Sequence, residues 1–177
     1  ILSHVEYAGL IPQLEEINAH FEDEDLVLVE SRQISDMHTL ALPLAYVYGR
    51  NVLVIEGKVP DTTVMTEFLA WARSRYRKVF FIGGSESQLL SRSTTATLVA
   101  LERFEIPEYE SAYRAYPHEV RYKLYDFGVY ELSLRLRPPE DFALDVGAMD
   151  DLFLRQFHAK EEHGTLGTSF RWTREVS

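Results

Sequence analysis

The chain has 177 residues, 46% hydrophobic and 26% charged, which excludes a disordered tail, a collagen-like repeat and a charged linker and allows a sizeable core. Its formal charge of −10 argues against nonspecific binding to nucleic acid or anionic lipid, because both need clustered Lys and Arg. The lack of cysteine excludes disulfides and thiolate metal sites, and no apolar run approaches the roughly 18 to 20 residues that direct membrane insertion requires.

Three short apolar runs, at residues 26–30, 52–56 and 79–83, are the strongest structural signal in the chain. They are rich in branched and aromatic residues and do not alternate with polar ones, which is typical of strands covered on both faces. Their spacing suits a strand, a crossover helix and two short loops. We therefore predict a parallel βαβαβ core.

The segments around these runs have helical spacing. Residues 10–21 place an apolar residue at every third or fourth position, and residues 61–76 do the same, with Asp61 as the predicted N-cap. Between the first two strands, Gly49 is placed to end a helix in the left-handed conformation. Pro43 leaves two alternatives there: the helix begins near Thr39, or it begins at Asp36 and bends.

Four cations follow or end the helix predicted at residues 61–76, namely Arg73, Arg75, Arg77 and Lys78. We favour placement at the negative end of the helix dipole over a phosphate-binding patch.

Beyond residue 85 the periodicity weakens. Residues 94–104 and 129–136 are predicted as strands, and residues 107–125 as an ordered loop packed by its tyrosine rings, which are either buried or, less commonly, exposed for stacking on sugars. Short antiparallel strands are predicted within residues 143–172.

These elements together predict an α/β fold, a Rossmann-like three-layer sandwich whose parallel three-strand βαβαβ core is extended by additional β-strands and a short β-rich C-terminal segment. The Arg-Pro-Pro-Glu run at 137–140 predicts a domain boundary, with residues 1–137 as the α/β domain and residues 138–177 as the start of a β-rich region. Because the chain lacks an initiator Met and stops soon after a predicted strand, we expect it to be part of a longer polypeptide.

Ligands of open parallel sheets bind outside the carboxyl ends of the strands, where loops and helix N-termini converge. In this sequence those ends supply a polar rim. The ligand-binding candidates are Glu30, Arg32, Asp36, His38, Lys58, Gly83, Gly84 and Ser85. In the functional interpretation the glycines allow the backbone to approach an anion, Ser85 adds a hydroxyl, and Arg32 or Lys58 adds positive charge. A Gly-Gly-Ser sequence is also common in turns that have no ligand, and this structural interpretation is the more frequent one.

No motif in the sequence assigns a reaction. The Gly-rich fingerprints of dinucleotide and P-loop enzymes are absent, and Ser31, Asp36 and His38 lack the Gly-x-Ser-x-Gly elbow that would expose a catalytic serine. His158 and His163 are five residues apart, which does not place both on one face of a helix as in zinc proteases. We assign no catalytic residue, metal site or cofactor.

Three segments carry a family resemblance: residues 25–32 (DLVLVESR), residues 40–46 (LALPLAY) and residues 170–173 (FRWT). They resemble the soluble C-terminal region of bacterial multi-pass membrane proteins that look like lipid-linked-sugar glycosyltransferases. The resemblance implies an α/β module on the extracytoplasmic face of the inner membrane, attached to the remainder of a larger polypeptide. The catalytic carboxylates of that family lie in loops between membrane helices, which this chain lacks.

Two functions follow as hypotheses. The first is a noncatalytic accessory domain of a bacterial envelope protein that binds glycan or lipid-linked sugar. The alternative is a standalone Rossmann-like enzyme that holds a nucleotide-sugar or another phosphorylated substrate at residues 83–85 with Arg32.

Overall fold

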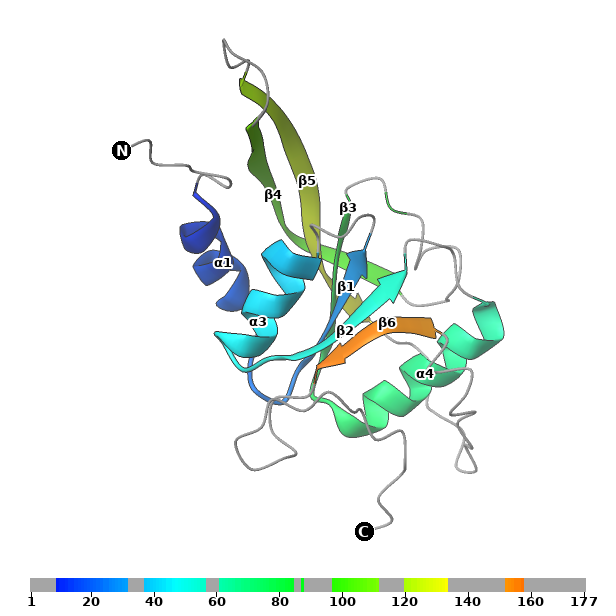
Figure 1. The fold of residues 1–177 in the computed structure, drawn as a ribbon. Helices are drawn as coiled ribbons and strands as arrows, with labels where there is room; N and C mark the ends of the chain where they lie inside the picture. Colours follow the sequence, from blue (N-terminus) through cyan, green and yellow to red (C-terminus); the bar gives the residue numbers. More distant parts are fainter. Residues whose placement is uncertain are drawn as a thin grey trace.

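The computed structural model describes residues 9–31, 37–56, 61–84, 87, 97–111, 120–133 and 152–157, with the backbone alone at 37–38, 56, 106–111, 120–125 and 154–157. These residues form one mixed sheet with helices packed against it (Figure 1). The strands are β1 Leu26–Ser31, β2 Asn51–Glu56, β3 Val79–Gly84, β4 Thr97–Ser111, β5 Val120–Ser133 and β6 Phe153–Phe157. The helices are α1 Leu10–Asn18, η1 Met37–Ala41, α3 Leu42–Tyr46 and α4 Thr62–Arg75.

The three predicted apolar strands are β1, β2 and β3, and they lie side by side at the centre of the sheet. The strand order of the whole sheet is β4-β5-β3-β1-β2-β6. β1 is parallel to both β2 and β3, whereas β5 and β6 run antiparallel to β3 and β2. The predicted parallel core, its extension by further strands and the α/β class are therefore confirmed. The flanking strands make the whole sheet mixed.

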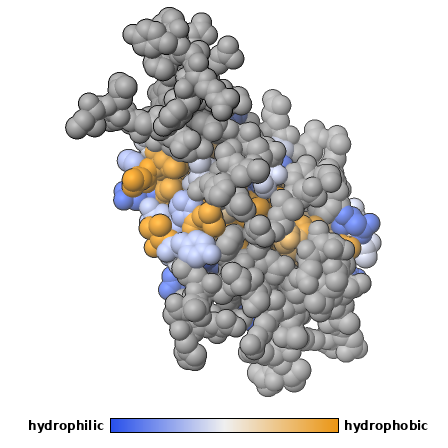
Figure 2. Space-filling model, viewed as in Figure 1, coloured by the Kyte–Doolittle hydropathy of each residue, from blue (hydrophilic) through white to orange (hydrophobic). Residues whose placement is uncertain are grey.

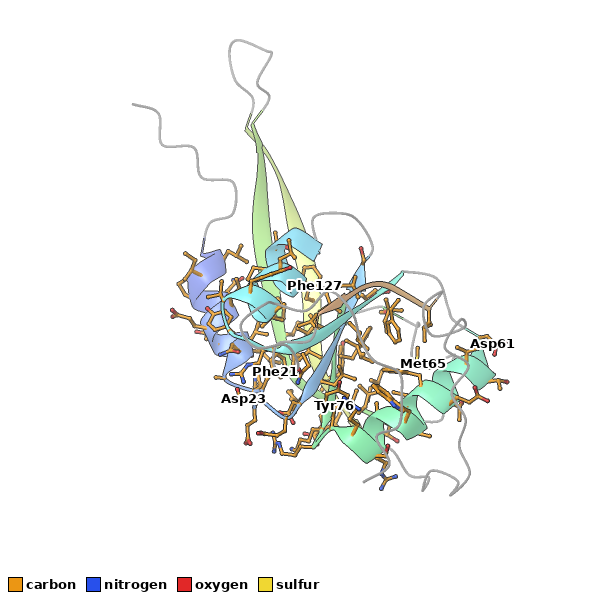
Figure 3. The ribbon with its side chains drawn as sticks, turned by 60° about the horizontal axis from the view of Figure 1, so that its bottom comes forward. Phe21, Asp23, Asp61, Met65, Tyr76 and Phe127 are labelled. Atoms are coloured by element: carbon orange, nitrogen blue, oxygen red, sulfur yellow. The ribbon has the colours of Figure 1, made fainter. Side chains whose placement is uncertain are left out.

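Alternate residues of the central strands face two separate cores. Val27 and Val29 pack with α1 and α3 on one face, while Leu26 and Leu28 pack with α4 on the other. Figure 3 shows Phe21 and Phe127 on the first side and Met65 on the second. Because the crossovers from β1 to β2 and from β2 to β3 lead in opposite directions along the sheet, the usual right-handed crossover places α3 and α4 on opposite faces.

The predicted helix ends are confirmed where the structure describes them. The Asp61 side chain accepts hydrogen bonds from the backbone N–H groups of Thr63 and Val64, at 2.9 and 3.1 Å. Gly49 has φ of 66° and so occupies the left-handed region that favours glycine. The predicted apolar stripe of α4 is buried.

The helical segment around Pro43 includes residues on the N-terminal side of Thr39. The described helical backbone runs from Met37, with π-helical turns over Met37–Ala41 and α-helical turns from Leu42. Pro43 falls in the first turn of α3, where its missing N–H costs little, and the wider π turn precedes it. Asp36, the predicted cap, lies outside the described residues.

The prediction of a loop over residues 107–125 is wrong for most of that segment. β4 continues to Ser111 and β5 begins at Val120, and the two form an antiparallel hairpin whose register runs to the pair Ser111↔Val120. In Figure 1 this hairpin extends beyond the other strands. Pro107 lies in β4, an edge strand of the described sheet, where one side of the backbone needs no partner. The loop prediction rested on the richness of this segment in tyrosine, proline and charge, and it did not take account of pairing between the two halves of the hairpin.

The face shown in Figure 2 carries separate apolar patches among polar side chains. Two of the exposed apolar side chains are Ile11 of α1 and Val47 at the end of α3, which are 68% and 73% exposed. Isolated exposed apolar residues are ordinary features of protein surfaces.

A polar network ties together the end of the sheet where β1 and β3 begin. The Asp25 side chain is fully buried and accepts two hydrogen bonds from Arg77, at 2.9 Å from Nε and 2.6 Å from Nη2. The Glu22 backbone N–H adds a third at 2.7 Å. Asn51 donates from Nδ2 to the backbone oxygens of Asp23 and Asp25. The network fixes the entry to β1 against the segment that enters β3.

The cations that follow α4 pair with carboxylates. Arg77 pairs with Asp25, and Lys78 lies 3.0 Å from Glu131 of β5. The hydrogen bond to Asp25 raises the pKa of Arg77 above its ordinary value, with burial opposing the shift. A raised arginine pKa means that the guanidinium keeps its charge at neutral pH, and that its deprotonation removes the contribution of this pair only in strong alkali.

We expect Asp25→Ala to lower the free energy of unfolding by about 2 kcal/mol, because hydrogen bonds to a charged group are lost and the Arg77 guanidinium loses its partner. Urea unfolding followed by circular dichroism measures the loss. The matched control is Asp126→Ala, which removes the same two-bond pairing from Arg103, a side chain that is 65% exposed. Its loss should be clearly smaller, since solvent screens that pair. Equal losses in the two variants would contradict the role given to Asp25.

Candidate functional site

The carboxyl ends of β1 and β3 form the place in this sheet where a ligand site is expected. The two strands are parallel neighbours, so their carboxyl ends meet at one edge. The chain leaves β1 toward β2, on one side, and leaves β3 toward β4 and β5, on the other. Ligands of open α/β sheets bind in the crevice where neighbouring connections diverge in this way. We call this position the switch point, defined by Glu30, Gly83 and Gly84.

A buried glutamate joins the two strand ends at the switch point. Glu30 is 5% exposed, and its Oε2 accepts a hydrogen bond from the Gly84 backbone N–H at 3.0 Å. Its Oε1 accepts a second from the Ser87 hydroxyl, also at 3.0 Å. The last registered pair between these strands is Val29↔Ile82, so the side chain of Glu30 extends the pairing beyond the backbone ladder.

Both donors to Glu30 are neutral. Within the described residues no Lys, Arg or His forms an ion pair with this carboxylate. This separates it from Asp25 at the opposite end of β1, whose charge is matched by Arg77. A carboxylate has about four acceptor positions, and two of those of Glu30 are used by Gly84 and Ser87. Chemically, the group can accept further hydrogen bonds from hydroxyl or amine donors.

Gly83 leaves the space that this arrangement needs. A Cβ at this position would lie 2.8 Å from Glu30 Oε2 and closer still to the Phe81 ring. Gly128 of β5 stands directly opposite Gly83, and a Cβ there would meet the Tyr130 ring. The rings of Phe81 and Tyr130 are themselves in contact, with centroids 6.2 Å apart. Gly83 therefore makes room for the Phe81 ring and the Glu30 carboxylate, and Gly128 makes room for the Tyr130 ring.

The other predicted site residues have different outcomes. His38 belongs to the π-helical turn η1 that opens the connection from β1 to β2, and π turns are frequent at functional sites. Arg32, Asp36, Lys58 and Ser85 lie outside the described residues. The structure thus brings together Glu30, Gly83 and Gly84 from two segments more than 50 residues apart in the chain.

Ser87 is a contact that the sequence did not single out. Residues 85–87, which directly follow β3, contain two serines, and Ser85 was the one predicted to supply a hydroxyl. Ser87 hydrogen-bonds through Oγ to Glu30, and its backbone N–H donates to the Gly84 carbonyl at 2.9 Å. Composition alone does not rank two serines that are two positions apart in the sequence, because the choice depends on where the Glu30 carboxylate lies.

The described residues contain no group of three or more His, Asp or Glu side chains placed to hold a metal ion. No described helix is both long enough and apolar enough to cross a membrane. Comparison of the chain with protein-family models, with curated proteins and with solved structures gave no match.

We expect Gly83→Ala to lower the free energy of unfolding by about 1 to 3 kcal/mol, because the new Cβ would overlap the Phe81 ring and Glu30 Oε2. It should also shift the Gly84 amide signal in a nitrogen–proton correlation spectrum, since the Glu30 carboxylate must move. Gly49→Ala is the matched control: it has open space around its Cβ and costs only about 1 kcal/mol for its positive φ. An unmoved Gly84 signal in Gly83→Ala would contradict the packing described for this glycine.

Proposed function

We propose that this chain is a noncatalytic accessory module of a larger bacterial envelope protein, and that it binds the hydroxyl groups of a glycan or lipid-linked sugar at the switch point. The single observation that carries the proposal is the Glu30 carboxylate, buried at the diverging ends of β1 and β3 and bonded only to neutral donors in the described part of the chain. In this proposal the α/β fold is a Rossmann-like three-layer sandwich used as a binding scaffold.

Carboxylates suit sugar recognition because each oxygen accepts a hydrogen bond from a hydroxyl, and such bonds to a charged acceptor are stronger than those between neutral groups. Glu30 is held in place by Gly84 and Ser87, so little side-chain freedom is lost when a sugar binds. The role as an accessory module on the extracytoplasmic face rests on the resemblance carried by residues 25–32, 40–46 and 170–173.

A nucleotide-sugar enzyme is the second candidate, favoured by the two glycines at the carboxyl end of β3. In that role the backbone of Gly83 and Gly84 would face a phosphate, with Arg32 supplying positive charge. If the protein turns over a nucleotide-sugar, and if Arg32→Ala lowers the turnover rate, this candidate is supported over the accessory module.

The accessory-module proposal is tested by titrating the protein with neutral saccharides, namely the methyl glycosides of glucose and mannose and N-acetylglucosamine oligomers. We expect the amide signals of Gly84 and Ser87 to shift, and Glu30→Gln to weaken binding about tenfold or more, the factor that corresponds to a hydrogen bond to a charged group. Glu15→Gln removes the same charge from the exposed surface of α1 and should leave affinity unchanged. Saccharide titrations that move neither signal, or affinities that fall equally in both variants, would refute sugar binding at this position.

A further inference from the structure

We propose that Glu30 is the specificity-determining residue of the switch point, and that it excludes phosphate groups and admits neutral hydroxyl groups. This inference rests on the proposed function, because it names the ligand class of the same site. It also distinguishes between the ligands left open above: the sugar part of a lipid-linked sugar fits the switch point, and its phosphate does not.

The first step concerns the hydrogen-bond donor. In parallel α/β proteins that bind phosphorylated ligands, free backbone N–H groups at the carboxyl ends of the strands donate to the phosphate oxygens. Here the Gly84 N–H already donates to Glu30 Oε2, and the Ser87 hydroxyl donates to Glu30 Oε1. Among the described residues at this strand end, an anion that belongs to the protein therefore already uses these two donors.

The second step concerns charge. Glu30 is buried, and within the described residues no cation pairs with it. The described cations next to β3, Arg77 and Lys78, precede its opposite end and pair with Asp25 and Glu131. A phosphate at the Gly84 N–H would therefore face a like charge in a poorly hydrated position, where Coulomb repulsion is strong.

The third step concerns space. Glu30 has no room to withdraw toward β3, because its Oε2, the Phe81 ring and the backbone of Gly83 are already close together. A hydroxyl group does not require it to withdraw, since a hydroxyl donates to the unused acceptor positions of the carboxylate. The same geometry that repels a phosphate thus offers an acceptor to a neutral sugar.

The test uses inorganic phosphate as the probe and the Gly84 amide signal as the readout, in the wild-type protein and in Glu30→Ala. Phosphate should leave this signal unmoved in the wild type. In Glu30→Ala, which frees the Gly84 N–H and removes the repulsion, phosphate should shift the signal. Glu15→Gln, which changes the net charge equally at an exposed site, should behave as the wild type.

Phosphate that shifts the Gly84 signal of the wild-type protein overturns the proposal, and so does a folded Glu30→Ala variant that gains no phosphate binding. If Glu30→Ala does not fold, the test uses Glu30→Gln, which keeps the shape of the side chain and removes its charge. Phosphate affinity should then rise in Glu30→Gln, and an unchanged affinity overturns the proposal. Failure of the saccharide titration is a separate result, because it removes the proposed sugar ligand while phosphate exclusion by Glu30 can still hold.

Discussion

The parallel pairing of β1 with β2 and β3 is the interaction on which the rest of this structure depends. All three strands are apolar over nearly their whole length, so each must be covered on both faces, and the helices before and between them supply that cover. The two crossovers lead in opposite directions along the sheet, and β1 therefore lies between its two partners. Divergence of the chain after β1 and β3 is a direct consequence of this order.

Each end of β1 carries a buried carboxylate, and the two carboxylates have different environments. Asp25, before the strand, is matched by Arg77 and by the Glu22 N–H, so its charge is compensated within the fold. Glu30, near the end of the strand, is held by a backbone N–H and a serine hydroxyl. The first arrangement stabilises the entry to the sheet. The second leaves a carboxylate with unused acceptor positions where ligands of such sheets bind, which is why the functional proposals centre on Glu30.

Local signals in the sequence were sufficient where one segment decides its own structure. The apolar runs specified the central strands, Asp61 and Gly49 marked helix ends, and the spacing of apolar residues identified the buried side of α4. Local signals were insufficient where the structure of a segment depends on its contacts with a distant segment. Residues 107–111 and 120–125 lie in a segment rich in tyrosine, proline and charge, yet they are strands because each half of the hairpin supplies the hydrogen bonds of the other. The sequence likewise gave no signal for the π-helical turn before Pro43.

The sequence by itself determined that an α/β sheet would form and which strand ends would be polar. Both features depend on residues that are neighbours in the chain, namely the apolar residues of each strand and the polar residues that follow it. Only the tertiary structure decided which of those polar residues meet. Glu30 and Gly84 are 54 positions apart, and their contact exists because β3 pairs with β1 on the side opposite β2. Which serine binds the Glu30 carboxylate, and why position 83 must be glycine, depend in turn on where that carboxylate and the Phe81 ring lie. These distances between residues far apart in the chain cannot be deduced from the order of residues alone.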